Sequence, residues 1–213
     1  MKKITLLFFL FLGINSFGQQ LYVEAGKTLS SFDYKNSDGN GLDNLHATSQ
    51  SFMTMGYRNT IFTKKLYGSF GASYAGYGAV GSDDAVGNFF EWNVNYVEFN
   101  VGLDYEVFTA NKFKFYVKGT GSIEFLMQGY QTLNNMVIDL KNNDDFDKTL
   151  FDFRGGLGAS YKISADLSLY TQFMYGKSLK LKDGTSNTDD QEELRIISKN
   201  VSFGLLINLS EQK

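Results

Sequence analysis

Apolar and polar side chains alternate along most of this chain with a period of two residues. Residues 96–105 show the alternation without a break. The apolar positions there are Val97, Phe99, Val101, Leu103 and Tyr105, and the intervening positions are Tyr96, Glu98, Asn100, Gly102 and Asp104. Successive side chains of a β-strand point to opposite faces. The pattern therefore predicts an extended strand with one apolar face and one mainly polar face.

Eight segments carry this two-faced pattern. They are residues 20–34, 48–59, 65–78, 92–106, 112–127, 150–163, 167–179 and 196–209. Each is long enough to cross a bilayer as a tilted strand, which takes about 9–11 residues. The chain contains no proline, which agrees with a fold made of strands, because proline cannot donate a backbone hydrogen bond to a neighbouring strand.

The connections between the predicted strands alternate in length. Short connections follow the second, fourth and sixth strands, at 60–64, 107–111 and 164–166. Long polar connections follow the first, third, fifth and seventh strands, at 35–47, 79–91, 128–149 and 180–195. In transmembrane barrels short turns face the periplasm and longer loops face outward. We therefore predict an all-β fold, an eight-stranded antiparallel up-and-down transmembrane β-barrel with both termini in the periplasm.

Residues 1–18 have the features of an export signal. Lys2 and Lys3 precede an apolar run, Ile4–Leu12, that is too short to span a bilayer, and Ser16 and Gly18 supply small residues before an expected cleavage site. We expect a signal peptide at 1–18 and one outer-membrane β-barrel domain at 19–213. The chain has no cysteine, so we expect neither a lipid anchor on cysteine nor a disulfide framework.

The charge balance and the loop motifs argue against several classes of function. The formal net charge of −3 provides no electrostatic basis for nucleic-acid binding. Asp38–Asp43 resembles a calcium loop, but Leu42 stands where that loop needs an oxygen ligand. Acidic clusters at 143–147 and 189–193 are expected to be solvated, with cation bridges to lipopolysaccharide phosphates as the alternative. We predict no metal site and no cofactor.

Periodicity leaves open which way the apolar face points. In a secreted lipocalin-like barrel the apolar face lines the lumen, whereas in a membrane barrel it contacts lipid. The polar face of this chain carries charges of both signs, which can pair inside a lumen. The predicted lumen charge network consists of Arg58, Glu98, Asp104, Lys114, Lys118, Glu124, Asp152 and Arg154. Glu24 lies on the same face.

Glycines and aromatic residues favour the lipid-facing sense. Most strand glycines, Gly156 and Gly204 among them, fall on the polar face, where small residues make room inside a narrow barrel. Aromatic residues of the apolar face gather near strand ends, where membrane interfaces are expected. They are Tyr57, Tyr105, Phe113 and Tyr161 on the turn side and Tyr74, Phe125, Phe151 and Tyr175 on the loop side.

The last predicted strand carries a pattern like an assembly signal. Ser202, Gly204, Ile207 and Leu209 fit the C-terminal β-signal of outer-membrane barrels, with Leu209 in place of the usual aromatic and Ser210–Lys213 following it. With the signal peptide, this resembles the small outer-membrane β-barrel proteins of Gram-negative bacteria, especially Bacteroidetes, often called the porin family, with a barrel like that of OmpA and OmpX. The resemblance implies outer-membrane lipid, lipopolysaccharide and the barrel-assembly machinery as partners.

No catalytic motif stands out. His46 is the only histidine, and Ser49 and Ser51 lie near it, but no spacing defines a triad. An eight-stranded barrel is just wide enough for side chains to fill it, so a charge-filled lumen argues against an open pore. We expect a non-enzymatic outer-membrane protein with a structural or surface-interaction role. The alternatives are a narrow porin-like channel for small solutes, a lipid A-modifying surface enzyme and a secreted lipocalin-like ligand-binding barrel.

Overall fold

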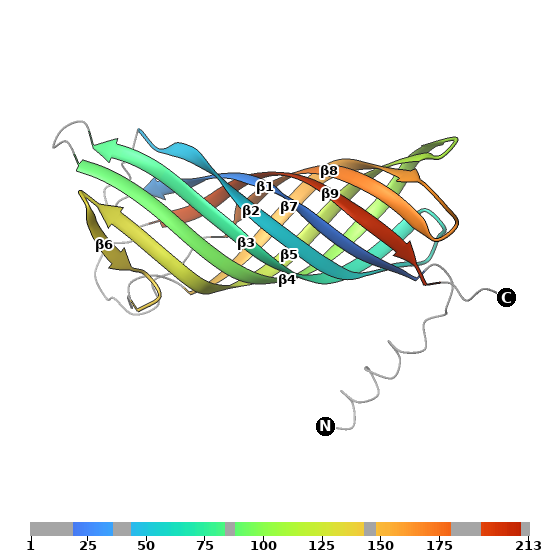
Figure 1. The fold of residues 1–213 in the computed structure, drawn as a ribbon, viewed down its shortest axis with the longest axis horizontal. Coiled ribbons are helices and arrows are strands. Elements are labelled where there is room, and N and C mark those ends of the chain that lie inside the picture. Colours follow the sequence, from blue (N-terminus) through green and yellow to red (C-terminus); the bar gives the residue numbers. More distant parts are fainter. Residues whose placement is uncertain (1–18, 36–43, 84–87, 143–147, 180–192, 210–213) are drawn as a thin grey trace, which may run out of the picture.

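The chain forms a long barrel of antiparallel strands (Figure 1). The computed structural model describes residues 19–35, 44–83, 88–142, 148–179 and 193–209. Its strands are β1 (Gln20–Lys35), β2 (His46–Thr60), β3 (Leu66–Asp83), β4 (Asn88–Ala110), β5 (Phe113–Leu133), β6 (Met136–Asp139), β7 (Thr149–Lys162), β8 (Leu167–Ser178) and β9 (Glu193–Asn208). Within these ranges there is no helix of sufficient length and apolarity to cross a membrane.

Eight of the strands close on themselves. Each barrel strand pairs antiparallel with its neighbour along the chain, and β1 pairs with β9 to complete the circle. Among the described strands, the short strand β6 pairs with β5 alone and lies at the end of the barrel opposite the short turns (Figure 1). The predicted eight-stranded up-and-down architecture is confirmed, and the predicted strands match the observed ones in order and in approximate extent.

Two of the features predicted from the sequence lie outside the described residues. The expected signal peptide at 1–18 is one, and the loop motifs at 38–43, 143–147 and 189–192 are the other. The three short turns are described. They join β2 to β3, β4 to β5 and β7 to β8, and they lie at the same end of the barrel as the start of β1 and the end of β9 (Figure 1).

The apolar face of the barrel points outward. On β4, Phe99 and Val101 are 55% and 65% exposed, whereas Glu98, the residue just before Phe99, is fully buried. Equivalent outward side chains on the other strands include Val23, Met55, Phe70, Val117, Phe153, Phe173 and Phe203. A continuous apolar outer surface of this kind marks contact with lipid rather than water. The lipocalin-like alternative, which requires an apolar lumen and a polar exterior at these positions, is wrong.

The polarity of the two faces reverses near the loop end. On β4, Val94 and Tyr96 point inward and are fully buried, while Asn93 and Asn95 occupy the outward positions. The strands β3, β4 and β5 also run farther than expected, through residues predicted to be loop. Where a barrel wall leaves the bilayer, its exterior meets water and its interior can hold apolar side chains. The reversal on β4 therefore marks the edge of the apolar belt.

The hairpin between β5 and β6 was not predicted. Its turn residues are Asn134 and Asn135, and both have positive φ angles, 47° and 70°. Two successive positive φ angles define the tight hairpin turn that matches the twist of the strands, and asparagine tolerates that conformation better than most residues. The Asn-Asn pair was the available signal for this hairpin.

Glycine on the inner face makes room for tyrosine. A β-carbon on Gly158 would collide with the ring of Tyr116, and one on Gly204 would collide with the ring of Tyr170. Both tyrosines are buried in the lumen. Close approach of a ring to the opposite backbone explains why the inner face of these strands carries glycine.

Two adjacent glycines of β7 allow a matched test of this packing. A β-carbon on Gly156 would overlap the backbone of Phe173 and the side chain of Met174, whereas one on Gly155 would meet nothing within 4 Å. We expect Gly156→Ala to lower the free energy of unfolding by about 1–3 kcal/mol, the cost of overpacking. Gly155→Ala should be neutral or slightly stabilising. Urea unfolding of the lipid-inserted barrel measures both, and equal effects of the two variants would contradict the packing.

Candidate functional site

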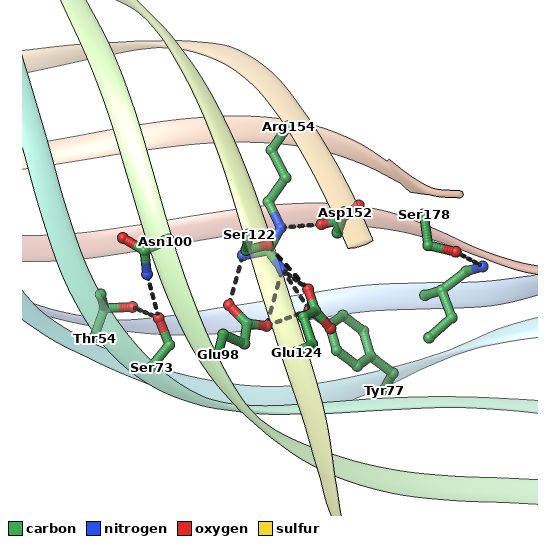
Figure 2. A network of polar contacts seen from close by, with 11 residues as sticks. Thr54, Ser73, Tyr77, Glu98, Asn100, Ser122, Glu124, Asp152, Arg154 and Ser178 are labelled. Atoms are coloured by element: carbon green, nitrogen blue, oxygen red, sulfur yellow. Dashed lines mark hydrogen bonds and ion pairs between the residues drawn. The ribbon is translucent and has the colours of Figure 1, made fainter. Parts of the chain in front are cut away.

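The middle of the lumen contains an ion cluster built on one arginine. Arg154 on β7 places Nη2 2.8 Å from Oε1 of Glu98 and 2.8 Å from Oε1 of Glu124, and its Nε lies 2.5 Å from Oδ2 of Asp152. Tyr77 donates a 2.5 Å hydrogen bond from its hydroxyl to Oε1 of Glu98 and accepts one from Arg154 (Figure 2). These five residues, the Arg154 cluster, connect β3, β4, β5 and β7.

The Arg154 cluster has more acidic than basic groups. Glu98, Glu124 and Asp152 are 0%, 1% and 5% exposed, and a single guanidinium lies among them. A buried carboxylate is stable only when it is paired or well hydrogen-bonded. Arg154 is therefore shared by all three carboxyl groups, and loss of this one side chain would leave the whole cluster without its cation.

A second ion cluster lies closer to the turns. Arg58 Nε is 2.9 Å from Oδ2 of Asp104, and Lys118 Nζ is 3.7 Å from the other oxygen of that carboxylate. The guanidinium carbon of Arg58 lies 4.0 Å from the centre of the Tyr67 ring, a cation–π distance. At the turn-side end, Lys114 Nζ forms a 2.9 Å ion pair with Glu106.

Glu24 forms a third polar contact set between the two clusters. Its Oε2 accepts hydrogen bonds of 2.9 Å from Tyr170, 2.8 Å from Gln172 and 3.1 Å from Ser202. Glu24 is buried, and these donors come from β8 and β9. The carboxylate thus joins the first strand to the last two by side-chain contacts as well as by the backbone ladder.

All eight side chains of the predicted lumen network lie on the inner face, but in separate groups. Arg154 contacts Glu98, Glu124 and Asp152. The remaining four residues lie on the turn side, where Arg58 and Lys118 contact Asp104 and Lys114 pairs with Glu106. Tyr77 was missed because its segment is rich in glycine and serine, which blurs the alternation between the faces.

An apolar cap fills the lumen on the loop side of the Arg154 cluster. The alternation of the sequence predicts a polar lumen throughout, so this cap is a difference from the prediction. Its buried members are Phe32, Phe52, Ala75, Tyr77, Ala79, Val94, Tyr96, Leu126, Leu140, Leu150 and Ile196, with Leu45 and Trp92 packed against them. Tyr77 belongs to both the cap and the cluster, so the two form one continuous obstruction.

Three small cavities follow one another from the turn-side mouth inward. The outermost, about 130 Å³, is lined by Arg58, Tyr116 and Leu206 among others. These three residues also line the next cavity, of about 10 Å³, which shares Tyr22 and Lys118 with a third of about 30 Å³. The third cavity reaches Arg154, where the path ends.

The remaining candidate residues lie outside the lumen network. His46 is exposed at the start of β2, and Ser49 and Ser51 are exposed on the same strand, with Ser51 accepting a hydrogen bond from Lys27. In the described part of the chain, no group of three or more metal-binding side chains is arranged to hold an ion. In β9, Ser202 is buried and Gly204 faces the Tyr170 ring, while Ile207 points outward, as does Leu209 just beyond the strand.

The sequence matches no protein family and no curated protein. Among solved structures, neisserial surface protein A is 16% identical, with 89% of this chain and 97% of that chain covered and a TM-score of 0.48. OprG of Pseudomonas aeruginosa is 13% identical, with 90% and 96% covered and a TM-score of 0.49. The protease OmpT of Escherichia coli is 6% identical, with 91% and 98% covered and a TM-score of 0.45. The chain is thus similar to outer-membrane barrels, and its own strand pairing establishes the eight-stranded closed barrel.

Proposed function

We propose that this chain is an integral outer-membrane protein with a closed lumen and a structural or surface-interaction role. The observation that carries the proposal is that, at the same height in the barrel wall, the outer face is apolar and the inner face is charged. Phe99 and Val101 face outward and are exposed, while Glu98 is buried in the Arg154 cluster. Such a wall is stable only with lipid outside. The cluster and the apolar cap leave the long connections as the surfaces available to partners.

The orientation in the membrane belongs to the same proposal. Both ends of the described chain lie at the barrel end that carries the short turns (Figure 1). Short turns face the periplasm in outer-membrane barrels, so we place the termini there and the long connections outside. Outer-membrane lipid, lipopolysaccharide and the barrel-assembly machinery are the expected partners. A protease added to intact cells should cut in the long connections and leave an epitope at the C-terminus intact.

The closed lumen predicts the absence of ion conduction. Protein reconstituted into planar bilayers should produce no unitary current steps at moderate voltage, because the Arg154 cluster and the apolar cap block the path. Heat-modifiable migration on gels, checked on the same sample, establishes that the inserted barrel is folded. Reproducible current steps from such a sample would contradict the closed lumen.

A narrow channel for small solutes is the second candidate, and one observation favours it. The three cavities form a row from the turn-side mouth to Arg154. Conduction would require both the cluster and the cap to rearrange. Current steps that appear after Glu98→Ala alone would show that the cluster is the barrier and that the cap does not block the path.

A catalytic role has no support among the described side chains. His46 is exposed, and within the described residues no hydrogen bond joins it to a nucleophile or to an orienting carboxylate, which general-base chemistry requires. We therefore extend the proposal to a non-enzymatic protein. Unchanged lipid A after overexpression is the expected result, and modification that disappears in His46→Ala would overturn this part.

A further inference from the structure

We propose that the turn-side mouth of the lumen is a binding site for a small oxyanion such as phosphate. The mouth is a cavity of about 130 Å³, named here the basic vestibule. Its charged lining residues are Arg58, Lys112, Lys114, Lys162 and Glu106. Four cationic side chains and one carboxylate therefore surround a space at the turn-side end of the lumen. This inference concerns the lumen alone and goes beyond the proposed surface role.

The cations of the vestibule differ in how far they are neutralised. Arg58 pairs with Asp104 behind the cavity, and Lys114 pairs with Glu106 at its wall. Lys112 Nζ lies 6.0 Å from the centre of the Tyr161 ring. Among the residues that the structure describes, neither Lys112 nor Lys162 has an ion-pair partner. An anion entering the cavity would complete the charge balance.

The shape of the vestibule strengthens its field. The floor and walls include the aromatic rings of Tyr67 and Tyr116, with Arg58 stacked against Tyr67 at 4.0 Å. A low-dielectric wall concentrates the field of the charges that line a cleft. The cavity is blind, because the path inward ends at the Arg154 cluster. A bound anion therefore enters and leaves by the same opening.

The donors favour an oxyanion over a halide or a cation. Arg58 and the lysines supply charged N–H groups, and Ser160, Ser168 and Asn208 add neutral donors around the same cavity. Phosphate and related oxyanions accept several such hydrogen bonds at once. A free solute and the phosphate group of a lipid share this chemistry. The lining residues lie at strand ends next to the short turns, which places the site at the aqueous end of the lumen.

The test uses the folded protein in a phosphate-free nonionic detergent, titrated with inorganic phosphate and followed by calorimetry and by amide NMR shifts. We expect saturable binding, with the largest shifts near the turn between β4 and β5. The double variant Lys112→Gln/Lys162→Gln should weaken binding by about tenfold or more, as loss of a charge-assisted hydrogen bond predicts. Lys199→Gln, which removes a charge from the outer face of β9, is the control and should leave affinity unchanged.

The outcomes separate specific binding from general attraction. Absence of saturation, or equal losses in the double variant and in Lys199→Gln, would overturn the site. To distinguish the two sources, the protein is also titrated with short-chain phosphatidic acid and with short-chain phosphatidylcholine. Phosphate binding that the phosphatidic acid does not displace supports a free solute as the ligand. Displacement by phosphatidic acid but not by phosphatidylcholine supports the site with a lipid phosphomonoester as its ligand.

Discussion

Replacing Arg154 with methionine should lower the free energy of unfolding by about 3–5 kcal/mol, the cost of removing one partner from a buried ion cluster. Methionine retains much of the side-chain volume, so the loss reports charge rather than a cavity. Glu98, Glu124 and Asp152 would remain buried without the guanidinium that contacts all three. Folded domains are stable by only about 5–15 kcal/mol. The variant should therefore unfold at a much lower urea concentration and show a lower yield of heat-modifiable barrel.

Lys177→Met is the matched control for Arg154→Met. Lys177 Nζ lies 3.4 Å from Asp33 in an ion pair whose side chains are 42% and 35% exposed. Exposed pairs contribute about 0–1 kcal/mol, so this variant should behave nearly as the parent. Adding Glu98→Gln and Glu124→Gln to Arg154→Met should recover part of the lost stability, because fewer buried charges then lack a partner. Equal stability of Arg154→Met and Lys177→Met would show that the cluster does not hold the barrel together.

Introducing arginine at Val101 should cost about 2–4 kcal/mol if the outer face meets the middle of a bilayer. Val101 is 65% exposed and lies between Phe99 and Leu103 in the outward row of β4. In a barrel surrounded by water, arginine at so exposed a position would cost almost nothing. The measurement is reversible unfolding in urea from lipid vesicles, with the fraction inserted read from gel migration.

Asn93→Arg is the control for depth, because Asn93 is an outward position on the same strand beyond the apolar belt. This variant should change stability by about 0.5 kcal/mol or less, as expected near or beyond the membrane interface. The result is the difference in the free energy of unfolding between the Val101 and Asn93 variants. Equal costs at Val101 and Asn93 would contradict the position of the apolar belt and with it the membrane location.

The strands and their faces could be predicted because alternation is a local signal. Val97 to Tyr105 alternate with Glu98 to Asp104, and the structure places the first set outside and the second inside. Strict alternation admits only two choices for each strand, and one choice suits the whole wall. The positions of the lumen charges followed from the same rule. Which charges meet across the lumen did not, because that depends on register and stagger between strands that are distant in sequence.

The apolar cap and the β5–β6 hairpin escaped prediction for a physical reason. Val94 and Tyr96 continue the alternation of β4, but the medium outside the barrel changes from lipid to water. The apolar side chains there therefore point into the lumen instead of outward. Sequence periodicity contains no marker for that boundary. The basic vestibule was equally hidden, because Arg58, Lys114 and Lys162 lie on three different strands and meet only when the barrel closes.

Closure by β1 and β9 sets the order in which this protein can fold. Their pairing runs from Gln20 opposite Asn208 to Lys35 opposite Glu193, so the two partners are separated by almost the whole domain. Contacts of such high sequence separation form late, since the entropy of the intervening chain opposes them. Until β9 is available, β1 presents an unpaired edge that can recruit strands from other chains. Whatever shields the edge of β1 during that interval therefore decides whether the chain becomes a barrel or an aggregate.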